Sequence, residues 1–193
     1  MTTCVLTIDF INEICHVDGK LSAYAARVVA NKTIERANTV TEHFRKSNAL
    51  IGHVKVGFNS HYKEASKKSP MFGKAKEYGV LALNNWATDF CDNLSVKENE
   101  FMITKHRVSP FYGTDLDLIL RENDIINLIL CGVGTNQAVE LAAREAHDRG
   151  YVVTIISDAC QCLNDYEQEA SLNFLKKIAT VVTTKEYTSS QNR

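Results

Sequence analysis

The stretch that decides the fold is Ile125–Glu140, with the sequence IINLILCGVGTNQAVE. Its first part, up to Cys131, is an almost unbroken apolar run, which is typical of a strand covered on both faces of a parallel sheet. Two glycines then indicate a tight turn, and Thr135 or Asn136 can cap a following helix. That helix is expected to end at Gly150. The stretch therefore predicts a buried strand, a tight turn and a helix.

The same alternation of strands and helices runs along the rest of the chain. Helices are recognised by apolar residues spaced three or four apart, and strands by short apolar runs. Strands are expected at Cys4–Ile8, Ala49–Val56, Phe101–Thr104, Ile125–Cys131, Tyr151–Ile156 and Thr180–Val182. Helices are expected over Ala25–Lys46, after Thr114, after Thr135 or Asn136, and over Tyr166–Lys177. This order predicts an α/β fold with a six-stranded, mainly parallel sheet.

A long polar stretch, residues 59–99, interrupts this order. It contains Pro70, Gly73, Gly79 and the single tryptophan, Trp86. We predict a loop with one or two short helices here. Loops of this length inside a compact domain are often functional lids or subunit contacts.

The composition excludes several classes of protein. The 193 residues are 45% apolar, and 22 basic residues against 23 acidic ones leave a net charge of −1. This balance argues against a nucleic-acid-binding protein and against a disordered acidic chain. No apolar run approaches the ~20 residues of a membrane span, and Asp9 interrupts what would be the apolar part of a signal peptide. We therefore expect one cytoplasmic domain over residues 1–193, without nucleic-acid or membrane partners.

The six cysteines favour free thiols over disulfides. Cys4 and Cys131 lie within apolar runs, and a chain of this size without a secretion signal is expected to keep its buried thiols reduced. Cys160 and Cys162 form a Cys-x-Cys pair, but no matching pair of Cys or His accompanies it at a zinc-site spacing. Zinc is therefore the weaker alternative, and we predict neither a metal ion nor another cofactor.

Reactive side chains follow the predicted strands at points that meet on one edge of the sheet. Asp9 comes after the first strand, Lys105 after the third, and the turn 131–136 after the fourth. Ligands of parallel sheets bind at this carboxyl edge. Taken singly, such an acid is often a turn residue, and such a lysine is usually a solvated charge. Together with a helix start, whose N–H groups stabilise an anion or an oxyanion, they predict a catalytic or binding site.

The turn itself does not indicate nucleotide binding. Gly132 and Gly134 lack the third glycine of the dinucleotide fingerprint, and no Gly-Lys-Ser/Thr follows as in a P-loop. A nucleotide-binding oxidoreductase therefore has only the type of sheet in its favour, and fold alone does not indicate function.

Several segments resemble the isochorismatase-like hydrolase superfamily, most of whose members are cysteine hydrolases. They are VLTIDFIN at 5–12, FYGTDL at 111–116, and CGVGTNQAVE at 131–140, which continues through AREAHD at 143–148 to Asp158-Ala-Cys160. With Lys105, they follow the order and spacing of the family along nearly the whole chain. The resemblance implies a Rossmann-like three-layer α/β/α sandwich and a small-molecule substrate. It also implies a homodimer or homotetramer, with residues 59–99 as a candidate subunit contact.

Most members of this family carry a catalytic triad of Asp, Lys and Cys. The resemblance assigns the first two roles to Asp9 and Lys105, whereas the position of the cysteine is held here by Ala138. Alanine cannot attack a carbonyl group, so a covalent cysteine mechanism is not expected. None of Cys131, Cys160 and Cys162 is placed to substitute for it. The sequence leaves open whether Ala138 is natural or an engineered replacement of a cysteine.

The isochorismatase branch of the family works without the cysteine and carries a small residue in its place. It cleaves a vinyl ether by acid catalysis, and Asp9, Lys105 and Ala138 fit that pattern. The stretch 55–58 lacks the glutamine that helps to seat isochorismate, and the stretch 54–61 lacks the Asp-x-His metal motif of nicotinamidases.

The resemblance thus implies a metal-free hydrolase of a small organic acid, or of an ether- or amide-type substrate. In this reading Asp9 is the general acid and base, and Lys105 is its partner. The alternative is a catalytically degenerate member of the family, or a Cys-to-Ala variant of a cysteine amidase, that binds a small ligand.

The remaining candidate site residues are expected to contact the substrate. An apolar wall could be formed by Phe10, Phe58 and Tyr112, with Trp86 as a further candidate. Gly134 and Thr135 are expected to offer backbone N–H groups, and Asn136 belongs to the same turn. The resemblance also implies a cis peptide bond in this turn, between Val133 and Gly134.

Overall fold

The structure is a computed structural model that describes residues 2–47 and 49–190. Within these residues, six parallel strands form one sheet in the order β3-β2-β1-β4-β5-β6. The strands are β1 (Thr2–Ile8), β2 (Leu50–Val56), β3 (Phe101–Lys105), β4 (Ile125–Val133), β5 (Val152–Gln161) and β6 (Thr180–Val182). The predicted parallel sheet is confirmed. Its strand order reverses between β1 and β4, so the ends of these two strands flank the crevice where ligands bind in such sheets.

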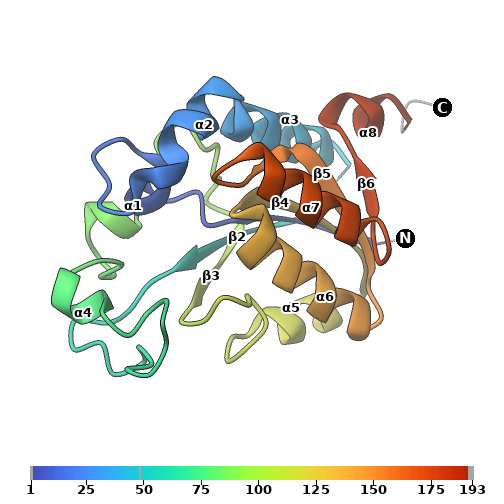
Figure 1. Cartoon of the computed structure of the whole chain (residues 1–193). Helices are drawn as coiled ribbons and strands as arrows, with labels where there is room; N and C mark the ends of the chain where they lie inside the picture. Colours follow the sequence, from blue (N-terminus) through green and yellow to red (C-terminus); the bar gives the residue numbers. More distant parts are fainter. Residues whose placement is uncertain (1, 48, 191–193) are drawn as a thin grey trace.

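Helices cover both faces of the sheet and give the molecule three layers (Figure 1). One face carries α5 (Leu116–Glu122), α6 (Glu140–Asp148) and α7 (Asp165–Leu175), and the other carries α2 (Ala25–Ala30), α3 (Thr33–Arg45) and α8 (Thr184–Ser190). The three-layer sandwich that the resemblance implied is therefore confirmed.

The core explains why β1 lies at the centre of the sheet. Cys4, Leu6 and Ile8 point to the face covered by α5, α6 and α7. Val5 points to the face covered by α3, and all of these side chains are fully buried. Alternate residues of a strand point to opposite faces, so a strand covered on both faces needs an unbroken apolar run. Burial of each large apolar side chain contributes about 1.5–3 kcal/mol.

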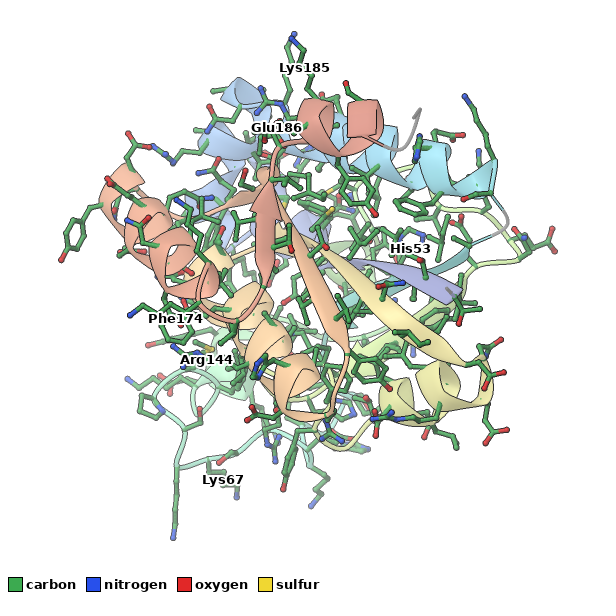
Figure 2. The ribbon with its side chains drawn as sticks, turned by 90° about the vertical axis from the view of Figure 1, so that its right-hand side faces the viewer. His53, Lys67, Arg144, Phe174, Lys185 and Glu186 are labelled. Atoms are coloured by element: carbon green, nitrogen blue, oxygen red, sulfur yellow. The ribbon has the colours of Figure 1, made fainter. Side chains whose placement is uncertain are left out.

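The helices α6 and α7 also contact each other. The guanidinium carbon of Arg144 lies 3.4 Å from the ring centroid of Phe174 (Figure 2). Arg144 in addition forms an ion pair with Glu140, with 2.7 Å between Nη2 and Oε1. The contact between Arg144 and Phe174 holds α7 against α6, the helix that follows the turn after β4.

The helix predicted over Ala25–Lys46 is divided in two. Lys32 adopts a left-handed φ of 51°, and the chain bends there between α2 and α3. The apolar spacing continues across the break, which is why the sequence pattern suggests one helix.

Strand β5 is longer than predicted. It continues past Ile156 to Gln161, through an irregularity in its pairing with β4 between Leu130 and Gly132. Asp158 therefore lies inside the strand rather than at its end. Its Oδ1 accepts hydrogen bonds from the backbone N–H and the hydroxyl of Thr184, at 2.7 and 2.8 Å, and so anchors α8, which the sequence did not predict.

The segment 57–100 contains only short helices, α4 (Ala75–Tyr78) and η2 (Trp86–Thr88), as predicted. It continues from the carboxyl end of β2 and lies beside α1 (Asn12–Cys15) (Figure 1). Phe58, Phe72, Val80 and Leu81 form a small separate core here. This core makes the segment a fixed wall next to the carboxyl edge of the sheet.

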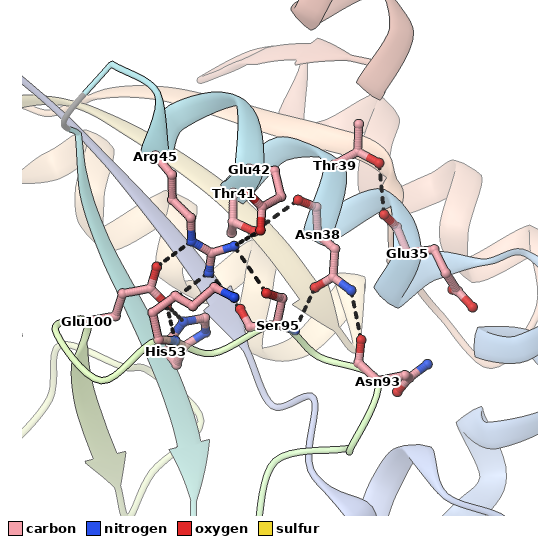
Figure 3. A network of polar contacts seen from close by, with 11 residues as sticks. Glu35, Asn38, Thr39, Thr41, Glu42, Arg45, His53, Asn93, Ser95 and Glu100 are labelled. Carbon is pink, nitrogen blue, oxygen red and sulfur yellow. Dashed lines mark hydrogen bonds and ion pairs between the residues drawn. The ribbon is translucent and has the colours of Figure 1, made fainter.

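A buried polar network joins α3, β2 and the residue before β3 (Figure 3). His53 Nε2 lies 2.9 Å from Glu100 Oε2, and Arg45 Nε lies 2.7 Å from Glu100 Oε1. The hydroxyl oxygen of Thr7 lies 2.7 Å from His53 Nδ1. The network positions the start of β3, the strand that ends in Lys105.

Candidate active site

Asp9 is the first residue after β1, and its backbone turns sharply there. Its φ is 60°, a left-handed value that is uncommon for a residue other than glycine. The backbone N–H donates to the carbonyl oxygen of Val54 at 2.9 Å, which continues the pairing of β1 with β2 by one residue. Backbone values of this kind cluster at functional sites. Here the turn leaves the side chain buried at the carboxyl edge of the sheet.

The carboxylate of Asp9 forms an ion pair with Lys105, the last residue of β3. Asp9 Oδ2 lies 2.8 Å from Lys105 Nζ, and the two side chains are 5% and 2% exposed. Nζ also donates to the carbonyl oxygen of Arg107 at 3.3 Å. Oδ1 of Asp9 is buried and has no hydrogen-bond partner within the described chain. The lysine therefore holds one oxygen and leaves the other for a ligand.

Burial raises the pKa of Asp9 above its ordinary value, and the charge of Lys105 only partly offsets this effect. The sequence left open which of the two influences is larger. A carboxyl group with a raised pKa keeps its proton at a higher pH and is better suited to act as an acid.

The turn after β4 reaches the same place from the other side of the switch point. The peptide bond between Val133 and Gly134 is cis, as the resemblance implied. Residues Thr135–Val139 form a single π-helical turn before α6 begins. Ala138 belongs to this turn, is 4% exposed, and lines the same cavity as Asp9 and Lys105.

No thiol lines the part of the cavity that the structure describes. All six cysteines are free and buried, as predicted. Burial raises the pKa of Cys160 to about 12 and that of Cys131 well above its usual range. Both thiols therefore stay protonated and are poor nucleophiles.

The cavity has a volume of about 440 Å³, which suits a small ligand. One wall is the carboxyl edge of the sheet, with Asp9, Lys105 and Ala138. The opposite wall is the segment 70–81, which contributes several apolar side chains: Phe72, Ala75, Val80 and Leu81. Met71, Lys74 and Tyr78 also line the cavity and are exposed, so they lie at its mouth. The sequence predicted a functional role for residues 59–99 but not this wall.

Tyr24 is a further lining residue, and the sequence analysis did not find it. It ends the single turn η1 (Ser22–Tyr24), between α1 and α2. No motif or periodicity singles it out, because its position depends on how the segment after α1 folds back over the sheet edge.

The other predicted substrate-binding residues are distributed differently. Gly134 lines the cavity. Phe10 is buried in the core on the α3 face, and Phe58 in the small core of the segment 57–100. Tyr112 is 65% exposed and lies beside Arg107. These three aromatic residues are outside the described lining of the cavity, so the apolar wall predicted from them is formed by the segment 70–81 instead.

Thr135 and Asn136 also lie outside the described lining, because their side chains face α7. The Thr135 hydroxyl donates to Gln168 Oε1 at 2.8 Å, and Asn136 Nδ2 donates to Glu167 Oε2 at 3.0 Å. These hydrogen bonds fix the turn that carries Gly134 and Ala138. The sequence showed where the turn lies, but not which way its side chains point.

Within residues 2–47 and 49–190, no group of three or more His, Cys, Asp or Glu side chains is arranged to hold a metal ion. In the same part of the chain, no helix has the length and apolar character that crossing a membrane requires.

Comparison with known proteins gives the family. The family model described as "Isochorismatase domain" matches residues 3–186. The chain therefore belongs to the isochorismatase family, a family of hydrolases.

Individual relatives agree with this assignment. The chain is 34% identical over 160 residues to the uncharacterised isochorismatase family protein YwoC of Bacillus subtilis, covering 82% of each chain. It is 32% identical over 130 residues to the ureidoacrylate amidohydrolase RutB of Acinetobacter baylyi, covering 67% of this chain and 46% of RutB. In fold, it matches an isochorismatase family protein from Desulfovibrio vulgaris with a TM-score of 0.88 at 19% identity, over 100% of this chain and 99% of the other.

Proposed function

We propose that this protein hydrolyses a small organic acid, or an ether- or amide-type substrate, by general acid–base catalysis without a covalent cysteine intermediate. Asp9 moves the proton, and Lys105 is its electrostatic partner. The observation that carries the proposal is that the two carboxylate oxygens of Asp9 are bound differently. Oδ2 is held by Lys105, whereas Oδ1 is buried without a hydrogen-bond partner in the described chain, at a cavity that Ala138 also lines.

A vinyl ether would be hydrolysed in three steps. Protonated Asp9 donates its proton from Oδ1 to the methylene carbon, and the double bond becomes an oxocarbenium ion. Water adds to that ion and returns a proton to Asp9. The resulting hemiketal then breaks its bond to the leaving oxygen and gives a ketone and an alcohol. The sum is the addition of one water molecule, and Asp9 ends in its starting state.

Lys105 stabilises the ionised state of Asp9. When the proton leaves, the ammonium group 2.8 Å from Oδ2 stabilises the new carboxylate. Because Nζ also donates to the carbonyl oxygen of Arg107, the lysine is held in position before the substrate arrives. A charge fixed in advance needs little reorganisation during the reaction.

The experiment is pyruvate release from isochorismate by the purified protein and by Asp9→Asn. We expect the variant to lose at least about a hundredfold in turnover, since general acid catalysis contributes 10²–10⁴-fold. Asp148→Asn, which changes an 84% exposed carboxylate, is the matched control and should keep full activity. Release by Asp9→Asn at the wild-type rate would exclude Asp9 as the acid. Absence of release by the wild type would exclude isochorismate.

A second candidate function is ligand binding without turnover, and Ala138 is the observation that favours it. A family member that has lost its nucleophile can keep the cavity and its ion pair. The two candidates differ in one measurement, because Asp9→Asn removes turnover from an enzyme, whereas a pure binding protein has no turnover to lose.

A further inference from the structure

A second residue that lines the cavity carries a buried polar atom without a hydrogen-bond partner in the described chain. The hydroxyl oxygen of Tyr24 is shielded from solvent and makes no hydrogen bond within the described chain. The same is true of Asp9 Oδ1, and both residues line the one cavity. Buried polar atoms are hydrogen-bonded in the large majority of cases, so each exception requires an explanation.

The Tyr24 hydroxyl is next to the turn that carries Ala138. A Cβ atom added to Gly134 would collide with the Tyr24 hydroxyl oxygen, so the absence of a side chain at Gly134 provides the space that this hydroxyl occupies. The phenol therefore reaches from η1 to the turn that carries Gly134 and Ala138.

The phenol is a hydrogen-bond donor throughout the working pH range. Burial, together with the charge of Asp9 and other nearby groups, raises the pKa of Tyr24 to about 12. A neutral phenol donates to a carbonyl or carboxylate oxygen and offers nothing to an apolar group. Most of the surrounding wall is apolar, including Ile14, Val56 and Val80, so a polar ligand atom has few partners besides the carboxyl edge of the sheet.

We propose that Tyr24 is a substrate-binding residue, whose hydroxyl donates a hydrogen bond to a carbonyl or carboxylate oxygen of the substrate. The substrate is then a compact molecule that carries such an oxygen on an apolar body. The oxygen lies between Tyr24 and Asp9, and the apolar body lies against the segment 70–81. This assignment rests on the proposed function for the location of the reacting edge, but it concerns binding and not turnover.

The test is a binding measurement with two probes of similar shape. 4-Fluorobenzoate carries a carboxylate on an apolar ring, and fluorobenzene is the same ring without the carboxylate. Fluorine NMR titrations give the affinity of each probe for the wild type and for Tyr24→Phe, which keeps the ring and removes only the hydroxyl. Tyr166→Phe, on an 83% exposed tyrosine of α7 outside the described lining, is the matched control.

We expect Tyr24→Phe to bind 4-fluorobenzoate about tenfold more weakly, as for the loss of one hydrogen bond in a buried site. Its affinity for fluorobenzene should not change. The melting temperature should stay the same or rise, because the hydroxyl has no partner when the cavity is empty. That combination distinguishes a binding role from a structural one.

Three results would overturn the proposal. Equal affinity of the wild type and Tyr24→Phe for 4-fluorobenzoate would show that the Tyr24 hydroxyl makes no hydrogen bond to this probe. An equal loss for both probes would indicate packing alone. A wild type that does not bind 4-fluorobenzoate would exclude this class of ligand. None of these results depends on turnover, so they are separate from a failure of Asp9→Asn to lose activity.

Discussion

Asp9 and Lys105 meet through one oxygen only, with 2.8 Å between Oδ2 and Nζ, at the carboxyl edge of the sheet. They come from β1 and β3, which are separated in the sheet by β2. Both strands end at the same edge because all the strands are parallel. Both side chains are buried, so each charge is stabilised mainly by the charge of the other.

This dependence predicts the stability of variants at the pair. Removing one partner of a buried ion pair leaves a buried charge and typically costs 3–5 kcal/mol. We expect Lys105→Met to lower the free energy of unfolding by about that amount at a pH where Asp9 is ionised. Asp9→Asn should cost less, because the raised pKa of Asp9 means that the fold disfavours its ionised form even beside Lys105. The double variant Asp9→Asn/Lys105→Met should be closer to the wild type than Lys105→Met, because it leaves no unpaired charge. Urea unfolding of the four proteins tests this, and simple additivity of the two losses would contradict it.

The raised pKa of Asp9 predicts the direction of the pH dependence. A carboxyl group whose pKa is higher in the folded state than in the unfolded state stabilises the fold fully below its unfolded pKa. That contribution is lost as the pH rises through the folded pKa. We therefore expect the free energy of unfolding of the wild type, relative to Asp9→Asn, to fall as the pH rises above the ordinary value of 3.8. A difference that grows with pH would show that Lys105 outweighs burial.

The same pKa predicts the pH profile of activity. If protonated Asp9 is the acid, kcat/KM should fall by about tenfold per pH unit once the pH exceeds the folded pKa of Asp9. The measurement is the pH–rate profile with the substrate that the protein turns over. A Lys105→Met variant should move this decrease to higher pH, since it removes the charge that lowers the pKa. A decrease that stays at the same pH in the variant would assign it to another group.

Much of the fold follows from the sequence for a simple physical reason. A strand buried on both faces needs a continuous apolar run, and Ile125–Cys131 and Cys4–Ile8 are such runs. Parallel strands place their carboxyl ends on one edge, so the neighbourhood of Asp9, Lys105 and the turn after β4 could be predicted without coordinates. Local pattern and sheet geometry were sufficient for both.

What could not be predicted depends on contacts between distant segments. Tyr24 reaches the cavity because the segment after α1 folds back over the sheet edge. No periodic pattern in the sequence indicates how this segment folds. The hydroxyl of Thr135 donates to Gln168 on α7, a contact that the position of Thr135 in the turn did not indicate. Strand β5 extends to Gln161 because β4 offers a partner beyond the irregularity at Leu130 and Gly132.

The network around Glu100 predicts a stability effect away from the cavity. Burial alone would raise the pKa of Glu100, but hydrogen bonds from Arg45 and His53 outweigh it and lower the pKa below its ordinary value. A carboxyl group with a lowered folded pKa stabilises the fold above its unfolded pKa, and the contribution is lost as the pH falls through the folded pKa. We expect Glu100→Gln to cost about 3 kcal/mol at pH 7, with a smaller difference from the wild type below pH ~4.5.

Glu42→Gln is the matched control for this prediction. Glu42 forms an ion pair with the same Arg45, with 2.7 Å between Nη1 and Oε1, but its side chain is 52% exposed. Exposed pairs contribute about 0–1 kcal/mol, so this variant should stay close to the wild type. Equal effects of the two substitutions in thermal unfolding would show that the buried network has no special role.

Ala138→Cys places a thiol in the cavity, whose described lining contains none of the six natural cysteines. Ala138 lines the cavity beside Asp9 and Lys105, whereas all six natural thiols are buried and none is in the described lining. We expect iodoacetamide to label one more thiol in Ala138→Cys than in the wild type under native conditions, and to label six thiols in the wild type and seven in the variant after denaturation. Intact-protein mass spectrometry gives the count. Native labelling of the wild type would contradict the burial of its thiols. A second measurement is whether Ala138→Cys hydrolyses a small amide that the wild type leaves intact. Such activity would show that the cavity is that of a cysteine amidase that lacks only its thiol. It would favour the second candidate function, ligand binding without turnover.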